Sequence, residues 1–161
     1  LIKLHASDNA RFSLRMQQLF DMLFILAIGV ALLVTLVAEP LISLLFGAEY
    51  RQSASILVIH VWGGVFIFMR ALFSRWILIE GALMFSLITQ GLGALANIGL
   101  NLLLIPRYGG EGAALATVLS YAIASWIALL AHPKTRPVFY MMTKSFFSPL
   151  RYAVSAAGAT R

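Results

Sequence analysis

The sequence contains no cysteine and very few charged residues. Without cysteine, disulfide bonds and thiolate metal sites are excluded, and the redox compartment stays open. Charged residues make up only 11% and hydrophobic residues 61% of the 161 residues, against about 25% and about 45–50% in soluble domains. Because this excess of apolar side chains demands an apolar solvent, the composition predicts a membrane protein.

Catalytic and metal-binding motifs are missing as well. The sequence has no nucleophile elbow, no HExxH, no P-loop and no close carboxylate pair, and its three histidines (5, 60 and 132) lack metal-ligand spacing. The glycines of segment 109–112 follow an apolar helix rather than a strand, so they indicate a turn and not a phosphate loop. We therefore predict no catalytic residue, no metal and no cofactor, and a protein that moves or holds a ligand rather than an enzyme.

Long apolar segments predict an all-α fold, a polytopic membrane helix bundle with four transmembrane helices. The four segments span about 19–46, 54–79, 82–105 and 113–131, within a transmembrane region 19–131. A connecting segment (1–18) precedes them, and a basic tail rich in aromatics (132–161) follows. Proline removes a helix hydrogen bond, so we expect a kink or break near Pro40.

The stretch 90–117 has the clearest pattern and predicts a membrane hairpin. Gly93, Asn97 and Asn101 are spaced four apart and share one helix face with Gln90, which must meet protein or a wet cavity because lipid cannot satisfy an amide. Pro106 and the following glycines then reverse the chain. For the asparagines we favour hydrogen bonding between helices, with substrate contact as the alternative. In the next helix small residues recur every four positions and predict a packing stripe: Gly112, Ala116, Ser120, Ala124 and Ala128.

The net charge of +6 is distributed unevenly about the four segments. Ten of the twelve basic residues lie before the first segment, near the second turn or in the tail, and these regions share one side of the membrane. Positive loops stay in the cytoplasm, so both ends are predicted to be cytoplasmic. Nucleic-acid binding is disfavoured, because the basic residues sit between apolar runs rather than in a patch.

Several segments, taken in order, resemble the C-terminal part of polysaccharide exporters. They are PLISLLFGAEY (40–50), ASIL (54–57), NIGLN (97–101), LIP (104–106), YG (108–109), GAA (112–114), AT (116–117) and PKTR (133–136). These exporters are the O-antigen and lipid-linked oligosaccharide flippases of the multidrug/oligosaccharidyl-lipid/polysaccharide (MOP) superfamily. The similar segments fall between residues 40 and 136.

The resemblance implies a bacterial inner-membrane, multi-pass transporter with about twelve or more helices in two lobes, of which these four are the last. It implies an undecaprenyl-diphosphate-linked oligosaccharide as substrate, moved from the cytoplasmic to the periplasmic leaflet by alternating access. The implied partners are the lipid bilayer, the N-terminal helices of the same protein and polysaccharide polymerase machinery. Since the chain begins at leucine with no signal peptide, we expect those N-terminal helices to be missing.

Seven residues are candidates for function. Arg70 and Arg75 are candidates for contacting a diphosphate, with anchoring at the headgroups as the more conservative interpretation. Gln90, Asn97 and Asn101 are candidates for hydrogen bonding to sugar hydroxyls. His60 and Glu39 are candidates for proton coupling, although a packing histidine and an interfacial glutamate are the simpler interpretations.

Three alternative functions stay open. A multidrug/cation antiporter of the same superfamily needs a buried acidic residue, and only Glu39 and Asp21 come close. A membrane-embedded glycosyl- or acyltransferase needs an acidic or histidine-based catalytic pair. A membrane scaffold that transports nothing is the third alternative.

Overall fold

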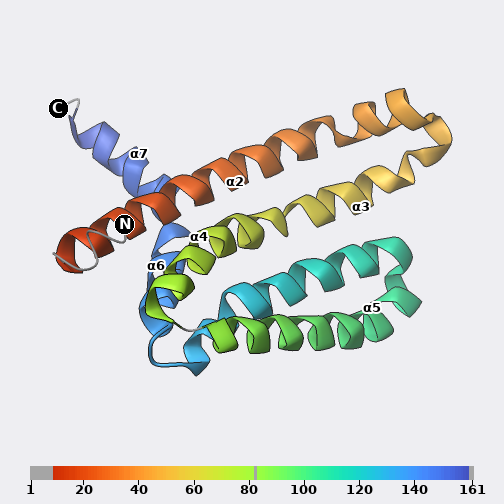
Figure 1. The fold of residues 1–161 in the computed structure, drawn as a ribbon. Coiled ribbons are helices and arrows are strands. Elements are labelled where there is room, and N and C mark those ends of the chain that lie inside the picture. The colour runs from red at the N-terminus through yellow and green to blue at the C-terminus, as the bar shows by residue number, and fades with distance from the viewer. Residues whose placement is uncertain (1–8, 82, 160–161) are drawn as a thin grey trace.

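The computed structural model describes residues 9–81 and 83–159, and every secondary-structure element among them is helical. This confirms the all-α class. Helix α3–α4 lies between α2 on one side and the two arms of α5 on the other, and the short helices α6 and α7 gather at one end (Figure 1).

The first helix, α2 (Asn9–Phe46), begins before the predicted membrane segment and runs through Pro40 without a break. The predicted break at Pro40 is therefore absent. A proline inside a helix removes one amide donor and crowds the carbonyl of the preceding turn, but apolar helices in lipid tolerate such a residue. Gly47, with φ 104°, ends the helix and leads into the 3-10 turn η1 (Ala48–Tyr50).

The second apolar segment forms two helices, α3 (Gln52–Val61) and α4 (Gly64–Glu80). They meet at Trp62–Gly63, where the Gly63 amide bonds the His60 carbonyl at 3.0 Å instead of continuing the α-helical pattern. Gly63 also lies against the ring of Tyr121: a Cβ at this position would stand 3.2 Å from Tyr121 Cδ2. The lack of a side chain at Gly63 thus lets α3–α4 approach α5 closely.

Helix α5 (Leu83–Ser125) folds back on itself at Gly109, whose φ of 54° and ψ of −131° lie outside the helical region. Its two arms run antiparallel, as the hairpin at the bottom of Figure 1 shows. A Cβ at Gly112 would overlap the Leu104 carbonyl, so the returning arm needs a glycine there. The predicted packing stripe is confirmed from Gly112 to Ala124, where all four of its residues are buried, and Ala128 beyond α5 is half-buried.

After α5 come a 3-10 helix, η2 (Ile127–Ala131), and the helices α6 (Arg136–Ser145) and α7 (Ser148–Ala159). Helix α6 packs against α2, while α7 projects from the bundle beside the start of α2 (Figure 1). The hydrophobic core lies where α2, α4 and α6 meet. On α2 it uses a helical row at intervals of four and three residues: Phe12, Met16, Phe20, Phe24 and Ala27.

Outside this core the molecule exposes large apolar side chains along its length. Leu36 and Leu44 of α2 are 79% and 82% exposed, and Leu102 of α5 is 73% exposed. Three helical stretches are long and apolar enough to cross a membrane: Arg11–Phe46, Gln52–Ile77 and Leu83–Ala131, the last being the stretch that reverses at Gly109. Such exposure is costly in water and favourable in a bilayer.

Candidate functional site

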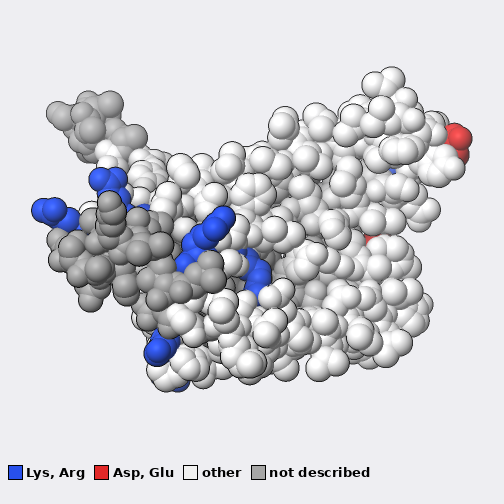
Figure 2. Space-filling model, in the orientation of Figure 1, with Lys and Arg blue, Asp and Glu red and all other residues white. Residues whose placement is uncertain are grey.

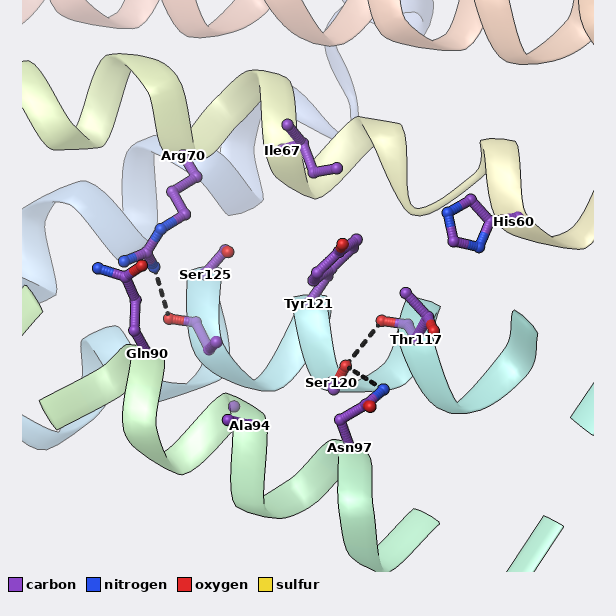
Figure 3. Close-up of a pocket in the computed structure, with 12 residues that line it drawn as sticks. His60, Ile67, Arg70, Gln90, Ala94, Asn97, Thr117, Ser120, Tyr121 and Ser125 are labelled. Atoms are coloured by element: carbon purple, nitrogen blue, oxygen red, sulfur yellow. Dashed lines mark hydrogen bonds between the residues drawn. The ribbon is translucent and has the colours of Figure 1, made fainter. Parts of the chain in front are cut away.

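A polar cavity of about 600 Å³ lies between α3–α4 and the two arms of α5. Figure 3 shows its walls, with Arg70 and Ile67 from α4 above and Gln90, Ala94 and Asn97 from the first arm of α5 below. The residues that complete the lining come from α3 and from both arms of α5: His60, Gly93, Thr117, Ser120, Tyr121, Ala124 and Ser125.

Arg70 closes one end of the cavity. Its guanidinium is partly buried and donates two long hydrogen bonds, from Nη1 to the Ala124 carbonyl at 3.2 Å and from Nη2 to Ser86 Oγ at 3.3 Å. One side chain of α4 thereby contacts both arms of α5. A guanidinium carries five donors in a planar fork, so Arg70 keeps donor capacity for an anionic ligand.

Amides and hydroxyls line the floor. Asn97 Nδ2 donates to Ser120 Oγ at 3.2 Å across the two arms, and Ser120 Oγ donates to the Thr117 carbonyl at 2.9 Å. Asn101 Nδ2 donates to Asn97 Oδ1 at 2.9 Å, and this bond fixes the Asn97 side chain. Asn97 therefore both joins the arms and faces the cavity.

Close packing of the two arms sets the depth of the floor. Gly93 is buried, and a Cβ at this position would stand only 2.6 Å from the Cβ of Ala124. With both residues small, the backbones approach closely, as helices do in lipid. The Asn97–Ser120 hydrogen bond spans the arms one turn further along.

The structure brings four of the seven candidate residues to one cavity: His60, Arg70, Gln90 and Asn97. Asn101 does not line the cavity and supports Asn97 from behind, with its own Oδ1 buried and unpartnered within the described residues. Arg75 is exposed outside the cavity. Glu39 also lies elsewhere, in an exposed ion pair with Arg51 at 3.0 Å.

Three further polar residues of the cavity follow a regular spacing in the sequence. Thr117, Tyr121 and Ser125 are spaced four apart, which places them on one face of the second arm. This row adjoins the small residues of the packing stripe, which by themselves predict only helix packing. A polar row on each arm of one hairpin is the pattern that would have predicted the cavity.

The electrostatic character of the cavity follows from its lining. It contains one guanidinium, one imidazole, two amides and several hydroxyls, and no Asp or Glu among the described residues that line it. Among the described residues no three His, Cys, Asp or Glu side chains cluster to hold a metal. Such a surface fits a ligand rich in hydroxyl groups that carries negative charge.

Comparison of the chain with models of known families, with curated proteins and with solved structures gives no match.

Proposed function

We propose that the chain is part of an inner-membrane transporter that flips undecaprenyl-diphosphate-linked oligosaccharide from the cytoplasmic to the periplasmic leaflet by alternating access. One observation carries the proposal: the cavity between apolar helices is lined by Arg70, amides and hydroxyls without a described carboxylate. The proposed identity of the ligand rests on the resemblance of the short segments between residues 40 and 136 to polysaccharide exporters.

The diphosphate, the sugar and the hydrocarbon chain of the ligand would each contact a different part of the molecule. Its diphosphate would take the free donors of Arg70, since guanidinium groups bind phosphate in a bidentate manner. Its sugar would lie toward Gln90, Asn97 and Tyr121, where amides and hydroxyls face the cavity. Its hydrocarbon chain would stay in the bilayer, against the exposed leucines of α5.

The proposed topology has four crossings, because each arm of α5 would cross the membrane separately. Lys and Arg gather at the end that holds α6, α7 and the start of α2, and the visible acidic atoms lie toward the other end (Figure 2). By the positive-inside rule the cationic end would face the cytoplasm. The hairpin turn at Gly109 and the η1 turn would then face the periplasm.

A cation antiporter would need a carboxylate that can exchange a proton with its substrate. Asp21 is the buried carboxylate of the described chain, but it lies outside the cavity and is ion-paired with Arg151 at 2.7 Å. Glu39 is exposed and paired with Arg51. The cavity chemistry therefore favours the flippase over the antiporter.

Deleting the gene in its host tests the function. Surface polysaccharide should fall, and the lipid-linked precursor should accumulate in the cytoplasmic leaflet. Normal polysaccharide without accumulation would refute the proposal. A loss of drug resistance with unchanged polysaccharide would favour the antiporter.

Two arginines on the same helix provide a matched pair of variants. Arg70→Gln should lower export at least about tenfold, because hydrogen bonds from a charged donor contribute about 1.5–3 kcal/mol. Arg75→Gln, outside the cavity, should leave export near the wild-type level at equal protein abundance. If the two variants lower export equally while both proteins are present in the membrane, the proposed role of Arg70 in ligand binding is refuted.

A further inference from the structure

A second groove, distinct from the polar cavity, lies at the cationic end of the molecule. It has a volume of about 320 Å³ and forms between the start of α5 and the segment that follows η2. Its lining comprises Gly81, Met84, Phe85, Ile88, His132 and Lys134. One side of this groove is apolar and the other carries nitrogen donors.

The donors come from the chain between η2 and α6. Lys134 is exposed, and the described residues offer its ammonium group no partner. His132 Nδ1 accepts the backbone N–H of Lys134 at 3.2 Å, so in the neutral ring the proton lies on Nε2, a second donor. The imidazole also packs against Phe85, with ring centroids 5.4 Å apart. These two contacts fix the ring beside Lys134.

The apolar wall belongs to α5. Met84 and Ile88 are 68% and 54% exposed, and both lie within the third stretch that is long enough to cross a membrane. They are spaced four apart and therefore share one face of the helix. The wall of the groove continues directly into the apolar surface that would contact lipid tails.

Among the described side chains, the charges at this end of the molecule are almost entirely positive (Figure 2). Arg11, Arg15, Arg136 and Lys144 are exposed on α2 and α6. Among the described side chains, the carboxylate near them is Asp21, which is buried and paired. An anionic molecule is therefore attracted to this end, and a cationic one is repelled.

We propose that this groove binds one anionic phospholipid of the leaflet at the cationic end, with phosphatidylglycerol as the simplest example. Lys134 and the Nε2–H of His132 would hold the headgroup phosphate, while an acyl chain would lie along Met84 and Ile88. A free phosphate would leave the apolar wall uncovered, and an acidic peptide would not match a surface that continues into the bilayer. This site is separate from the transport cavity and does not depend on the proposed function.

Native mass spectrometry of the purified protein with added lipid tests the site. Wild-type protein should retain one phosphatidylglycerol more strongly than phosphatidylcholine, and millimolar inorganic phosphate should not displace it. Lys134→Gln should weaken retention of this lipid about fivefold, the effect of roughly one basic residue at an anionic membrane surface. Lys134→Arg should keep the binding, because it preserves the charge.

Lys144→Gln is the matched control, since it removes an exposed cation from the same end without touching the groove. It should leave the tightly held phosphatidylglycerol in place. Ile88→Gln should weaken the retention of both lipids, because the wall contacts acyl chains and not the headgroup. Equal retention of the two lipids by the wild type, or equal losses in Lys134→Gln and Lys144→Gln, would refute the site.

Discussion

Asp21 is a single buried carboxylate on the apolar helix α2. The side chain is 3% exposed and accepts hydrogen bonds from Gln17 Nε2 at 2.8 Å and Ser145 Oγ at 2.7 Å. Arg151 Nη2 adds an ion pair at 2.7 Å, and Tyr152 lies at 3.5 Å. Three of these partners belong to α6 or to α7, so one carboxylate anchors the C-terminal helices to α2.

Replacing Arg151 by Met should destabilise the protein by about 1–3 kcal/mol. Removing one partner of a buried ion pair costs about 3–5 kcal/mol, and the effect is smaller here because the Arg151 side chain is 39% exposed. Unfolding of the protein in detergent micelles, followed by circular dichroism, measures the loss.

Arg51→Met is the control for that measurement. It breaks the Glu39–Arg51 pair, whose side chains are 60% and 66% exposed, and exposed pairs contribute only about 0–1 kcal/mol. If Arg151→Met lowers the free energy of unfolding no more than Arg51→Met does, the contacts of Asp21 do not anchor the C-terminal helices.

Within the helix α5, the packing of its two arms against each other determines the shape of the cavity. Gly93→Ala should destabilise the hairpin by about 1–3 kcal/mol, the usual cost of overpacking, because the new Cβ would meet that of Ala124 at 2.6 Å. The shape of the cavity should change as well, since Gly93 and Ala124 both line it. Unfolding in detergent micelles measures the first effect.

The neighbouring Gly91 supplies the control, because a Cβ there meets nothing within 4 Å. Gly91→Ala should be neutral or stabilising by up to about 1 kcal/mol, as expected from helix propensity. Adding Ala124→Gly to Gly93→Ala should recover part of the lost stability. Independent, additive effects of the two substitutions would contradict the close packing of the arms.

Features that depend on residues close together in the sequence could be predicted from the spacing of those residues. The reversal of α5 follows from the glycines after Pro106. The row from Gly93 to Asn101 and the small-residue stripe follow from intervals of four residues, and the Asn97–Asn101 bond joins residues four apart. The break at Trp62–Gly63 was not predicted, because two adjacent glycines are also tolerated inside a helix. At this break Gly63 lies against Tyr121, a contact between distant segments.

The candidate site was predictable only in part, for the same reason. Asn97 and Gln90 could be placed on one face by counting, whereas the approach of Arg70 to that face depends on how α4 packs against α5. Apart from Gln17, the partners of Asp21 lie 124 to 131 positions away along the chain, on α6 and α7. No periodicity in the sequence reports a contact of that range.

Most of the described Lys and Arg residues lie at one end of the molecule (Figure 2). The number of helix crossings decides which parts of the chain lie on the same side of the membrane. The first two long stretches each connect the two ends, and α5 returns at Gly109 to the end where it began (Figure 1). The start of α2 and the helices α6 and α7 consequently lie together. If α5 crossed as a single straight helix, the tail would lie on the opposite side from the start of α2.

Thiol labelling in intact cells tests this arrangement cleanly, because the chain has no cysteine of its own. Single cysteines at Glu49, Glu111 and Lys144 replace exposed side chains in η1, beside the α5 turn and on α6. With the cationic end in the cytoplasm, a membrane-impermeant maleimide should label Glu49→Cys and Glu111→Cys from outside. Lys144→Cys should react only after the membrane is permeabilised. Labelling of Lys144→Cys in intact cells together with Glu49→Cys would mean that α5 crosses once and that the hairpin does not form in the membrane. Labelling of Lys144→Cys alone would keep the four crossings and reverse the proposed orientation.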